Sequence, residues 1–398
     1  MNILQLCNKP PFPPVDGGTI VMNSATQGLL SAGCNVKVFS AYSDKHPVLS
    51  SQITNEYRKQ TKFEAVYFDL NINPFQALKC FLAGKSYHIK RFINKDFERR
   101  LTEILQEDSF DVVHMDSIFL TPYVETIRKH SQAKIVLRAH NVEHLIWKRI
   151  ADHTVNPFKR VYLKHVYATL RRYELEHLSD YDGIDCLSEV DSTFFKSCGI
   201  SRPMVVLPAV ITTPNVVKAT PVEENSLFHI GSMDWMPNDE GIGWFLKDVL
   251  PLITAKLPEV KVYLAGRKMP KKYFDYARTS SNLTVLGEVD DALDFMEGKQ
   301  INVVPLLSGS GFRVKIVEAM SLGKLVITTT VGAEGIAYED GKHLLIADTP
   351  ERFVSQIEKC INDKSLCETI GENARQLIRE EYDIEKVTQK LLDFYNTL

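Results

Sequence analysis

Long apolar segments are missing from this chain. None of its 398 residues lies in an apolar run of the roughly 18 residues that a membrane-spanning helix needs. The first residues, MNILQLCNKP, also lack the positively charged stretch and the following apolar stretch of a secretory signal peptide. We therefore expect a protein that stays in the cytoplasm.

Cysteine pairs are missing as well. The seven cysteines form no Cys-x-x-Cys pair, and an odd number of them cannot all be joined in disulfides. This pattern argues against a disulfide framework and against a structural zinc site. We expect the cysteines to be small core residues.

A strong charge of one sign is the third absence. The net charge is −3, with 47 Lys and Arg against 50 Asp and Glu, and the two halves of the chain differ only modestly. This balance does not predict nucleic-acid binding. Hydrophobic residues make up 44% and charged residues 24%, which leaves no room for a large disordered region.

The order of short apolar runs predicts two domains of the same kind. A chain of this length exceeds the usual size of one hydrophobic core, so two domains of roughly 200 residues are expected. Two successive βαβ series are typical of two Rossmann-like α/β domains with doubly wound parallel sheets, whose ligands bind beyond the carboxyl ends of the strands. The expected strands are NILQL, NVKVFS, FDVVHM, AKIVLRA, DGIDCL and PMVVL in the first series, and SLFHIG, VKVYLAG, NLTVLG, INVVPL, KLVITT and HLLIA in the second. The expected helices lie near 19–32, 91–106, 118–130, 157–179, 189–197, 239–255, 290–297, 312–322 and 351–362. A linker is expected between Pro208 and Pro221, and the chain after residue 364 is expected to be helical.

The segment from Ile301 to Gly335 is the strongest indication of chemistry. It reads as a buried strand, a loop of Ser308, Gly309, Ser310 and Gly311 that we call the Gly/Ser loop, a helix that begins near Phe312, and a second strand. A glycine loop that leads into a helix presents free backbone N–H groups and a partial positive charge, which suits a diphosphate. Arg313 and Lys315 would add cationic donors there.

Glu318 lies one turn further along the same helix and could accept hydrogen bonds from ribose hydroxyls. The alternative is a surface role, in which Arg313 and Lys315 are solvated and Glu318 pairs with Lys315 at i,i+3.

The stretch GFRVKIVEAMSLGKLVITTTVGAEGI resembles the signature of family 4 of the retaining glycosyltransferases, the glycosyl transferases of group 1. The family pattern is Gly-x-Arg-x-Lys-x-x-Glu-Ala, followed by a second strand and Gly-x-Glu-Gly. The resemblance implies the GT-B fold, with two Rossmann-like domains facing an interdomain cleft. It implies an acceptor-side domain over residues 1–207, a nucleotide-sugar donor domain over 208–380, and a C-terminal helix over 381–398 that packs back on the first domain.

The resemblance also implies a mechanism. Arg313 and Lys315 would hold the donor diphosphate and Glu318 the ribose, and we place His140 beside Arg313 and Lys315 as a catalytic candidate. The diphosphate would leave and the acceptor would attack on the same face of the sugar. The configuration at the anomeric carbon would thus be retained without a dedicated nucleophile. No cofactor and no metal are expected. The predicted partners are a nucleotide-diphosphate sugar and a saccharide or lipid-linked saccharide acceptor, with no nucleic acid.

The chain departs from the family at several positions. Ser310 stands where the family often carries a carboxylate that touches the donor sugar, and Ser232 and Asn238 stand where relatives often have Arg and Lys. Arg267, just after an expected strand, could supply the missing charge, or could lie in a surface turn. The candidates for donor binding are Gly17, Gly18, Gly231, Ser232, Arg267, Gly309, Ser310, Gly311, Phe312 and Glu318.

Polar residues also follow the expected strands of the first half. Gly17 and Gly18 come after a spacing too long for the tight GxGxxG turn of a dinucleotide site. In the resembling family such a loop lets the backbone approach the donor, and an ordinary left-handed turn is the alternative. His140 and His144 are four apart, but their order does not fit the HExxH zinc motif. The candidates for sugar or acceptor contacts are His114, Asp116, Asn141 and Glu143.

Residues 147–172 hold seven Lys and Arg against one acidic residue, with aromatic residues between them. Such a stretch could rest on anionic lipid headgroups at the inner face of the membrane, or form the solvated face of a packed helix.

A retaining, metal-independent glycosyltransferase is therefore the predicted function, in polysaccharide or glycoconjugate assembly. A GT-B nucleotide-sugar 2-epimerase and a catalytically silent nucleotide-sugar-binding protein are the alternatives. A Rossmann dehydrogenase is poorly supported, because no GxGxxG lies in either first βα turn.

Overall fold

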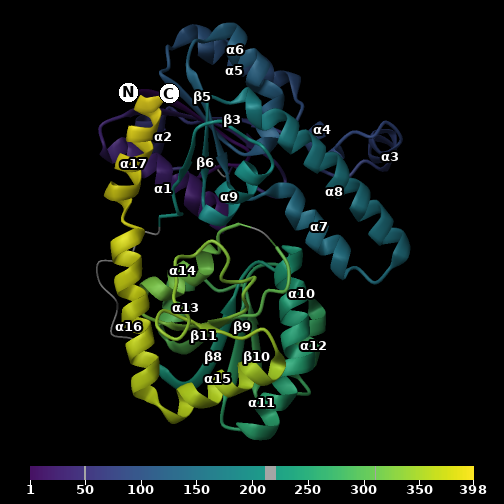
Figure 1. The fold of residues 1–398 in the computed structure, drawn as a ribbon, viewed down its shortest axis with the longest axis vertical. Coiled ribbons are helices and arrows are strands. Elements are labelled where there is room, and N and C mark those ends of the chain that lie inside the picture. The colour runs from purple at the N-terminus through teal and green to yellow at the C-terminus, as the bar shows by residue number, and fades with distance from the viewer. Residues whose placement is uncertain (49–50, 211–220, 310) are drawn as a thin grey trace. The chain divides into compact units, whose positions relative to one another are not determined.

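The computed structural model describes residues 1–48, 51–210, 221–309 and 311–398. The chain forms two compact units, each a parallel sheet with helices around it (Figure 1). The first unit comprises Met1–Val210, Ser310–Phe312 and Ile384–Leu398, and the second comprises Ile211–Gly309 and Arg313–Asp383. Most of the linker expected between Pro208 and Pro221 lies outside the described residues. None of the helices within these ranges is long and apolar enough to cross a membrane.

The first unit has a seven-stranded parallel sheet in the order β3-β2-β1-β4-β5-β6-β7. Its central strand β1 is buried on both faces. Leu4 and Leu6 pack into one core, and Ile3 and Cys7 pack into the other. The strands are β1 (Asn2–Cys7), β2 (Asn35–Tyr42), β3 (Glu64–Tyr67), β4 (Val112–Asp116), β5 (Lys134–Ala139), β6 (Gly183–Cys186) and β7 (Met204–Val206). The helices are α1 (Gly17–Ser31), α2 (Asn55–Thr61), α3 (Pro74–Leu82), α4 (Tyr87–Lys90), α5 (Lys95–Glu107), α6 (Val124–His130), α7 (Glu143–His153), α8 (Pro157–His177), α9 (Glu189–Ser197) and α17 (Ile384–Thr397), with short 3-10 helices at Ile118–Tyr123 and Leu178–Asp180.

The second unit repeats this topology in a six-stranded parallel sheet, in the order β10-β9-β8-β11-β12-β13. The strands are β8 (Glu223–Ile230), β9 (Lys261–Ala265), β10 (Leu283–Gly287), β11 (Lys299–Val304), β12 (Leu325–Thr328) and β13 (Leu345–Ile346). The helices are α10 (Met236–Trp244), α11 (Leu250–Lys256), α12 (Lys271–Ala277), α13 (Ala292–Glu297), α14 (Val314–Ser321), α15 (Pro350–Asn362) and α16 (Lys364–Glu381), and a π-helical turn at Phe245–Val249 joins α10 to α11.

Each sheet has a point where the strand order reverses. In the first unit it lies between β1 and β4, and in the second between β8 and β11. Ligands of open parallel sheets bind beyond the carboxyl ends of the strands at such a point. The loops after these four strands are therefore where a site is expected in each unit.

Helix α17 completes the first unit and lies along α1 (Figure 1). The Tyr395 hydroxyl lies 2.5 Å from Nδ1 of the buried His114 on β4. A Cβ added to Gly28 on α1 would lie 2.1 Å from Oγ1 of Thr388, so the two helices approach closely only because Gly28 has no side chain.

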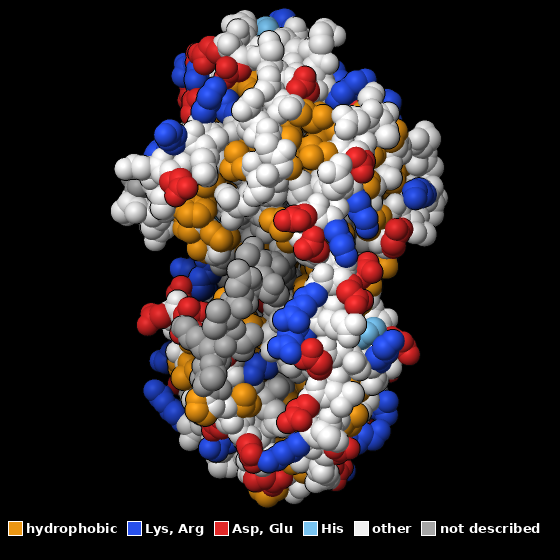
Figure 2. Space-filling model, turned by 90° about the vertical axis from the view of Figure 1, so that its left-hand side faces the viewer, with side chains coloured by type: hydrophobic (Ala, Val, Ile, Leu, Met, Phe, Trp, Pro, Cys, Tyr) orange, Lys and Arg blue, Asp and Glu red, His pale blue; other side chains and the backbone are white. Residues whose placement is uncertain are grey.

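Strand β3 was not predicted, the other strands lie where the sequence predicts them, and several helices differ. Helices α2, α3, α4, α7 and α12 were not predicted, and α14 begins at Val314, two residues after the expected start. The expected helix over 239–255 is divided by its π-helical turn, and the helical tail breaks between Glu381 and Ile384. Basic and acidic side chains intermingle over the face shown in Figure 2, as the small net charge suggests.

Candidate functional site

The loop after β11 brings Arg313 to the start of α14. Arg313 occupies the N-cap position, and Gly309 and Gly311 before it have φ values of +110° and +82°, which favour glycine. The Arg313 guanidinium lies 5.6 Å from the centre of the Trp235 ring. A Cβ on Gly309 would lie 3.1 Å from the guanidinium and 3.2 Å from that ring, so the glycine leaves room for both. Phe312 is buried, and Ser310 lies outside the described residues.

Lys315, in the first turn of α14, is directed toward the end of β8. Its Nζ donates to Oδ1 of Asn238 at 2.5 Å and lies 3.5 Å from Nε2 of His229. His229 Nδ1 lies 2.8 Å from the Val303 carbonyl, which assigns the proton to Nδ1 and leaves Nε2 as an acceptor for the ammonium. The alternative interpretation, in which Lys315 pairs with Glu318 at the surface, is therefore wrong, because Asn238 holds the ammonium instead.

The ammonium of Lys315 sits in surroundings that disfavour its charge. Burial and, to a smaller degree, the neighbouring charge of Arg313 lower its pKa to about 7, while Glu318 acts in the opposite direction. Burial also holds the pKa of His229 well below its usual range, so this imidazole stays neutral. An incoming anion would compensate the charge that this environment disfavours.

Two glycines let the backbone approach Lys315 closely. A Cβ on Gly231 would lie 2.9 Å from Nζ of Lys315. Gly266, at φ +137°, approaches Gly231 so closely that a Cβ would lie 1.8 Å from the Gly231 carbonyl oxygen. The backbone at the ends of β8 and β9 thus approaches the ammonium closely, with no side chain between them.

Ser232 and Asn238, which replace the cations of the resembling family, position Lys315. The Asn238 amide donates to the Ser232 carbonyl at 2.8 Å, and this fixes Oδ1 toward the ammonium. Ser232 Oγ donates to Asp234 at 2.5 Å. This role could not be predicted from the sequence, because Asn238 and Lys315 meet only when β8 pairs with β11.

Two further side chains border this region. Glu318 is half-buried, and burial raises its pKa to about 7, with Lys315 opposing the shift. The half-buried Arg267 follows β9, and its carbonyl accepts from Met233 N at 2.9 Å. Sequence reasoning missed Glu240 on α10, whose carboxylate accepts a hydrogen bond from the buried Ser308 in the Gly/Ser loop. Glu240 brings a carboxylate to this loop, where Ser310 lacks one.

In the first unit, Gly17 and Gly18 form the first turn of α1. Asp16 caps the helix by accepting from Thr19 N at 2.9 Å. The alternative of a left-handed turn is wrong, because both glycines are helical and neither has a positive φ. Lys9 Nζ lies 2.6 Å and His46 Nε2 3.2 Å from the Asp16 carboxylate. Burial would raise the pKa of Asp16, but Lys9 and the other partners outweigh it and lower the pKa to about 2.

His140 follows β5 and lies above a buried carboxylate. Its Nε2 is 3.4 Å from Oδ1 of Asp116, which is fully buried and accepts from Gln5 at 2.7 Å. Burial would raise the pKa of Asp116, but the hydrogen bond to His140 and nearby positive charge lower it to about 2. His114 is 1% exposed and engaged with Tyr395. His114 and Asp116 thus lie behind His140 in the interior, so we assign them to positioning rather than to the sugar contacts predicted.

Glu174 of α8 organises the residues after His140. Its carboxylate accepts from the backbone N of Glu143 and of His144, both at 3.1 Å, and so caps α7. The Glu174 carboxylate also lies 2.6 Å from Nδ1 of the buried His144. This contact explains the presence of His144, the second of the two histidines four residues apart. Within the described ranges, no group of three or more His, Cys, Asp or Glu side chains could hold a metal ion.

Asn141 and Glu143 face a small pocket that His140 also lines. The Asn141 amide donates to Glu143 at 3.1 Å. Burial raises the pKa of Glu143 to about 7, and the nearby charge of Glu174 contributes to the increase.

Comparison with known proteins identifies the chain. Residues 224–363 match the family of glycosyl transferases group 1. The fold is similar to that of Anabaena HepE, solved in complex with UDP, with a TM-score of 0.70 and 14% identity over 100% of both chains. Residues 224–363 of the chain thus carry a glycosyl transferases group 1 domain. The predicted resemblance to group 1 and the predicted GT-B fold are thereby confirmed, whereas membership of the retaining family 4 stays a prediction.

Two curated relatives of this glycosyltransferase match it in sequence. A 44.6 kDa protein of the cps region of Klebsiella pneumoniae is 24% identical over 389 residues, which is 95% of each chain. The capsular polysaccharide biosynthesis glycosyltransferase CapM of Staphylococcus aureus is 28% identical over 187 residues, covering 44% of this chain and 47% of CapM. The glycosyltransferase is thus related to capsular polysaccharide enzymes.

We predict that Glu318→Ala weakens nucleoside diphosphate binding by about 1–3 kcal/mol, the usual range for hydrogen bonds to a charged group. Calorimetric titration measures this, with Glu339→Ala, an exposed carboxylate of the same unit, as the control. If Glu318 holds the ribose, its removal should matter much less for the 2′,3′-dideoxy nucleotide. Equal losses for both nucleotides would remove Glu318 from the ribose site.

Proposed function

We propose that this glycosyltransferase moves a sugar, with retention at the anomeric carbon, from a nucleotide-diphosphate donor to a hydroxyl of a saccharide or lipid-linked saccharide. The reaction would serve polysaccharide or glycoconjugate assembly. The relation to CapM supports this assignment, and HepE, which shares the fold, was solved with UDP.

The partly desolvated Lys315 beside Arg313 is the observation that carries the proposal. Both cations lie at the start of α14, beyond the carboxyl ends of β8 and β11. When the glycosidic bond to the diphosphate breaks, negative charge develops on the β-phosphate. Cations and helix N–H groups held in place beforehand stabilise that charge without reorganising during the step. Arg313, Lys315 and the Gly/Ser loop would act in this way, and Glu318 would orient the ribose.

The first unit would bind the acceptor, with backbone N–H groups among its contacts. The first N–H groups of a helix lack partners within the helix, and Gly17 and Gly18 supply such groups without side chains. His140, held over Asp116, and the pair of Asn141 and Glu143 would bind hydroxyl groups of the sugar or acceptor. We assign no general base. In the proposed reaction the diphosphate leaves and the acceptor attacks on the same face of the sugar, so no dedicated nucleophile is needed.

We predict that transfer needs no added metal, because the proposed partners of the diphosphate are cationic side chains and backbone. Initial rates of nucleoside diphosphate release should be the same in EDTA and in magnesium. Activity that EDTA abolishes and magnesium restores would contradict this proposal.

We predict that Arg313→Ala and Lys315→Ala each reduce kcat by about 10²–10³, the usual loss when one such stabilising donor is removed. The loss appears in kcat because the interaction strengthens as the leaving group departs. Arg313→Lys should recover only part of the rate, since an ammonium cannot reproduce the guanidinium fork. Steady-state kinetics with a donor identified by thermal shift measure these effects.

The matched control for these variants is Arg278→Ala, which removes an exposed arginine of the same unit that pairs with Asp275. Melting curves establish that each variant is folded. Full activity of folded Arg313→Ala and Lys315→Ala would place the donor site elsewhere. Release of nucleoside diphosphate that is independent of any acceptor would favour a 2-epimerase, and binding without turnover would favour a silent binding protein.

A further inference from the structure

Two neighbouring helices of the first unit expose large apolar side chains. On α3, Phe75, Leu78 and Leu82 follow each other at helical spacing, and Phe75 is 86% exposed. At the start of α8, Phe158 is 87% exposed, and Val155 in the preceding loop is 96% exposed. We name these residues the α3–α8 surface; its exposed apolar members are Ile72, Phe75, Leu78, Leu82, Val155, Phe158, Val161 and Tyr162.

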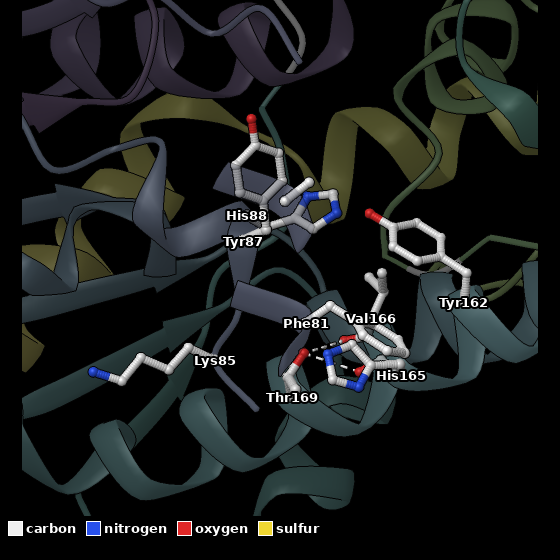
Figure 3. Close-up of a pocket in the computed structure, with 9 residues that line it drawn as sticks. Phe81, Lys85, Tyr87, His88, Tyr162, His165, Val166 and Thr169 are labelled. Atoms are coloured by element: carbon white, nitrogen blue, oxygen red, sulfur yellow. Dashed lines mark hydrogen bonds between the residues drawn. The ribbon is translucent and has the colours of Figure 1, made fainter. Parts of the chain in front are cut away.

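The two helices are joined by specific contacts, so the surface is continuous. Phe81 of α3 packs against α8, with its ring centre 4.2 Å from that of His165 and 6.5 Å from that of Tyr162 (Figure 3). Arg172 of α8 also donates to the carbonyl of Gly84, just after α3. These contacts hold the exposed faces of α3 and α8 together.

The charged side chains of the two segments that carry this surface are all positive. Residues 70–95 and 153–173 contain ten Lys and Arg and no Asp or Glu, in a chain whose net charge is −3. Lys79, Lys159, Arg160 and Lys164 are exposed among the apolar side chains. This separation of charge contrasts with the intermingled signs on the face of Figure 2.

These properties select one kind of partner. Exposed aromatic and aliphatic side chains gain free energy on entering the headgroup and acyl boundary of a bilayer, and cations beside them are attracted by anionic lipids. A second copy of the chain fits poorly, because a symmetric contact would bring the same cations against one another. The α3–α8 surface therefore matches an anionic lipid surface.

We propose that the α3–α8 surface docks this glycosyltransferase on an anionic membrane, with α3 and the start of α8 inserted at the headgroup level. The proposal goes beyond the proposed transfer reaction and does not rest on it. Docking would confine the enzyme to the surface where lipid-linked acceptors are found.

Co-sedimentation of the full chain with vesicles tests this, without donor or acceptor. Vesicles of phosphatidylcholine with phosphatidylglycerol should bind the chain, and vesicles of phosphatidylcholine alone should bind it far less. Replacing Lys159, Arg160 and Lys164 together with Ser should lower the partition coefficient by about 100-fold, since each cation near an anionic surface contributes several-fold. Leu82→Ser with Val155→Ser should lower it by about tenfold through lost apolar burial.

Each variant has a matched control of the same residue types. Lys247, Lys256 and Lys271, all exposed on the second unit, are replaced together with Ser, and Leu286→Ser with Val190→Ser removes two exposed apolar side chains elsewhere. These controls should bind vesicles as the unchanged chain does. Binding that is indifferent to anionic lipid, or equal in variants and controls, would overturn the proposal. Self-association that the surface variants abolish, without vesicle binding, would overturn it in favour of a second copy.

Discussion

An ammonium group held away from water is the constraint around which the second unit is arranged. Burial lowers the pKa of Lys315 to about 7, and the structure leaves this cost partly uncompensated. Asn238 and the neutral His229 hold the group in place without neutralising it, and Gly231 places no side chain beside it. A carboxylate in that space would have made an inert ion pair. Its absence fits a site whose counter-charge arrives with the ligand.

The first unit carries the opposite arrangement at the equivalent place in its sheet. Asp116 ends β4 as a buried anion, and His140 and Gln5 surround it with donors. The carboxylate fixes the imidazole of His140 from behind, whereas Glu174 fixes the following helix through its backbone. In both units, side chains that the solvent does not reach determine how the residues nearer the surface are oriented.

The sequence predicts the parts of this arrangement that are local. The strands follow from β-branched runs, and the Gly/Ser loop, Arg313 and Lys315 follow from one continuous motif. The sequence does not predict contacts made across the sheet. Asn238 reaches Lys315, and Glu240 reaches Ser308, only because β8 and β11 are neighbours. Helix α7 was missed for the same reason, since its cap comes from α8. The basic stretch was noticed, but its apolar partner α3 lies about 80 residues earlier in the chain.

The protons exchanged when a nucleoside diphosphate binds test the central claim most directly. At pH 8, a lysine with a pKa of about 7 is mostly neutral, and a bound diphosphate should return that pKa toward its ordinary value. Calorimetry at pH 8 in buffers of different ionisation enthalpy, with whichever of UDP, GDP or ADP binds, should show uptake of about 0.8 proton. The folded Lys315→Met variant should lose that uptake. Binding without proton uptake, or with equal uptake in the variant, would contradict the account.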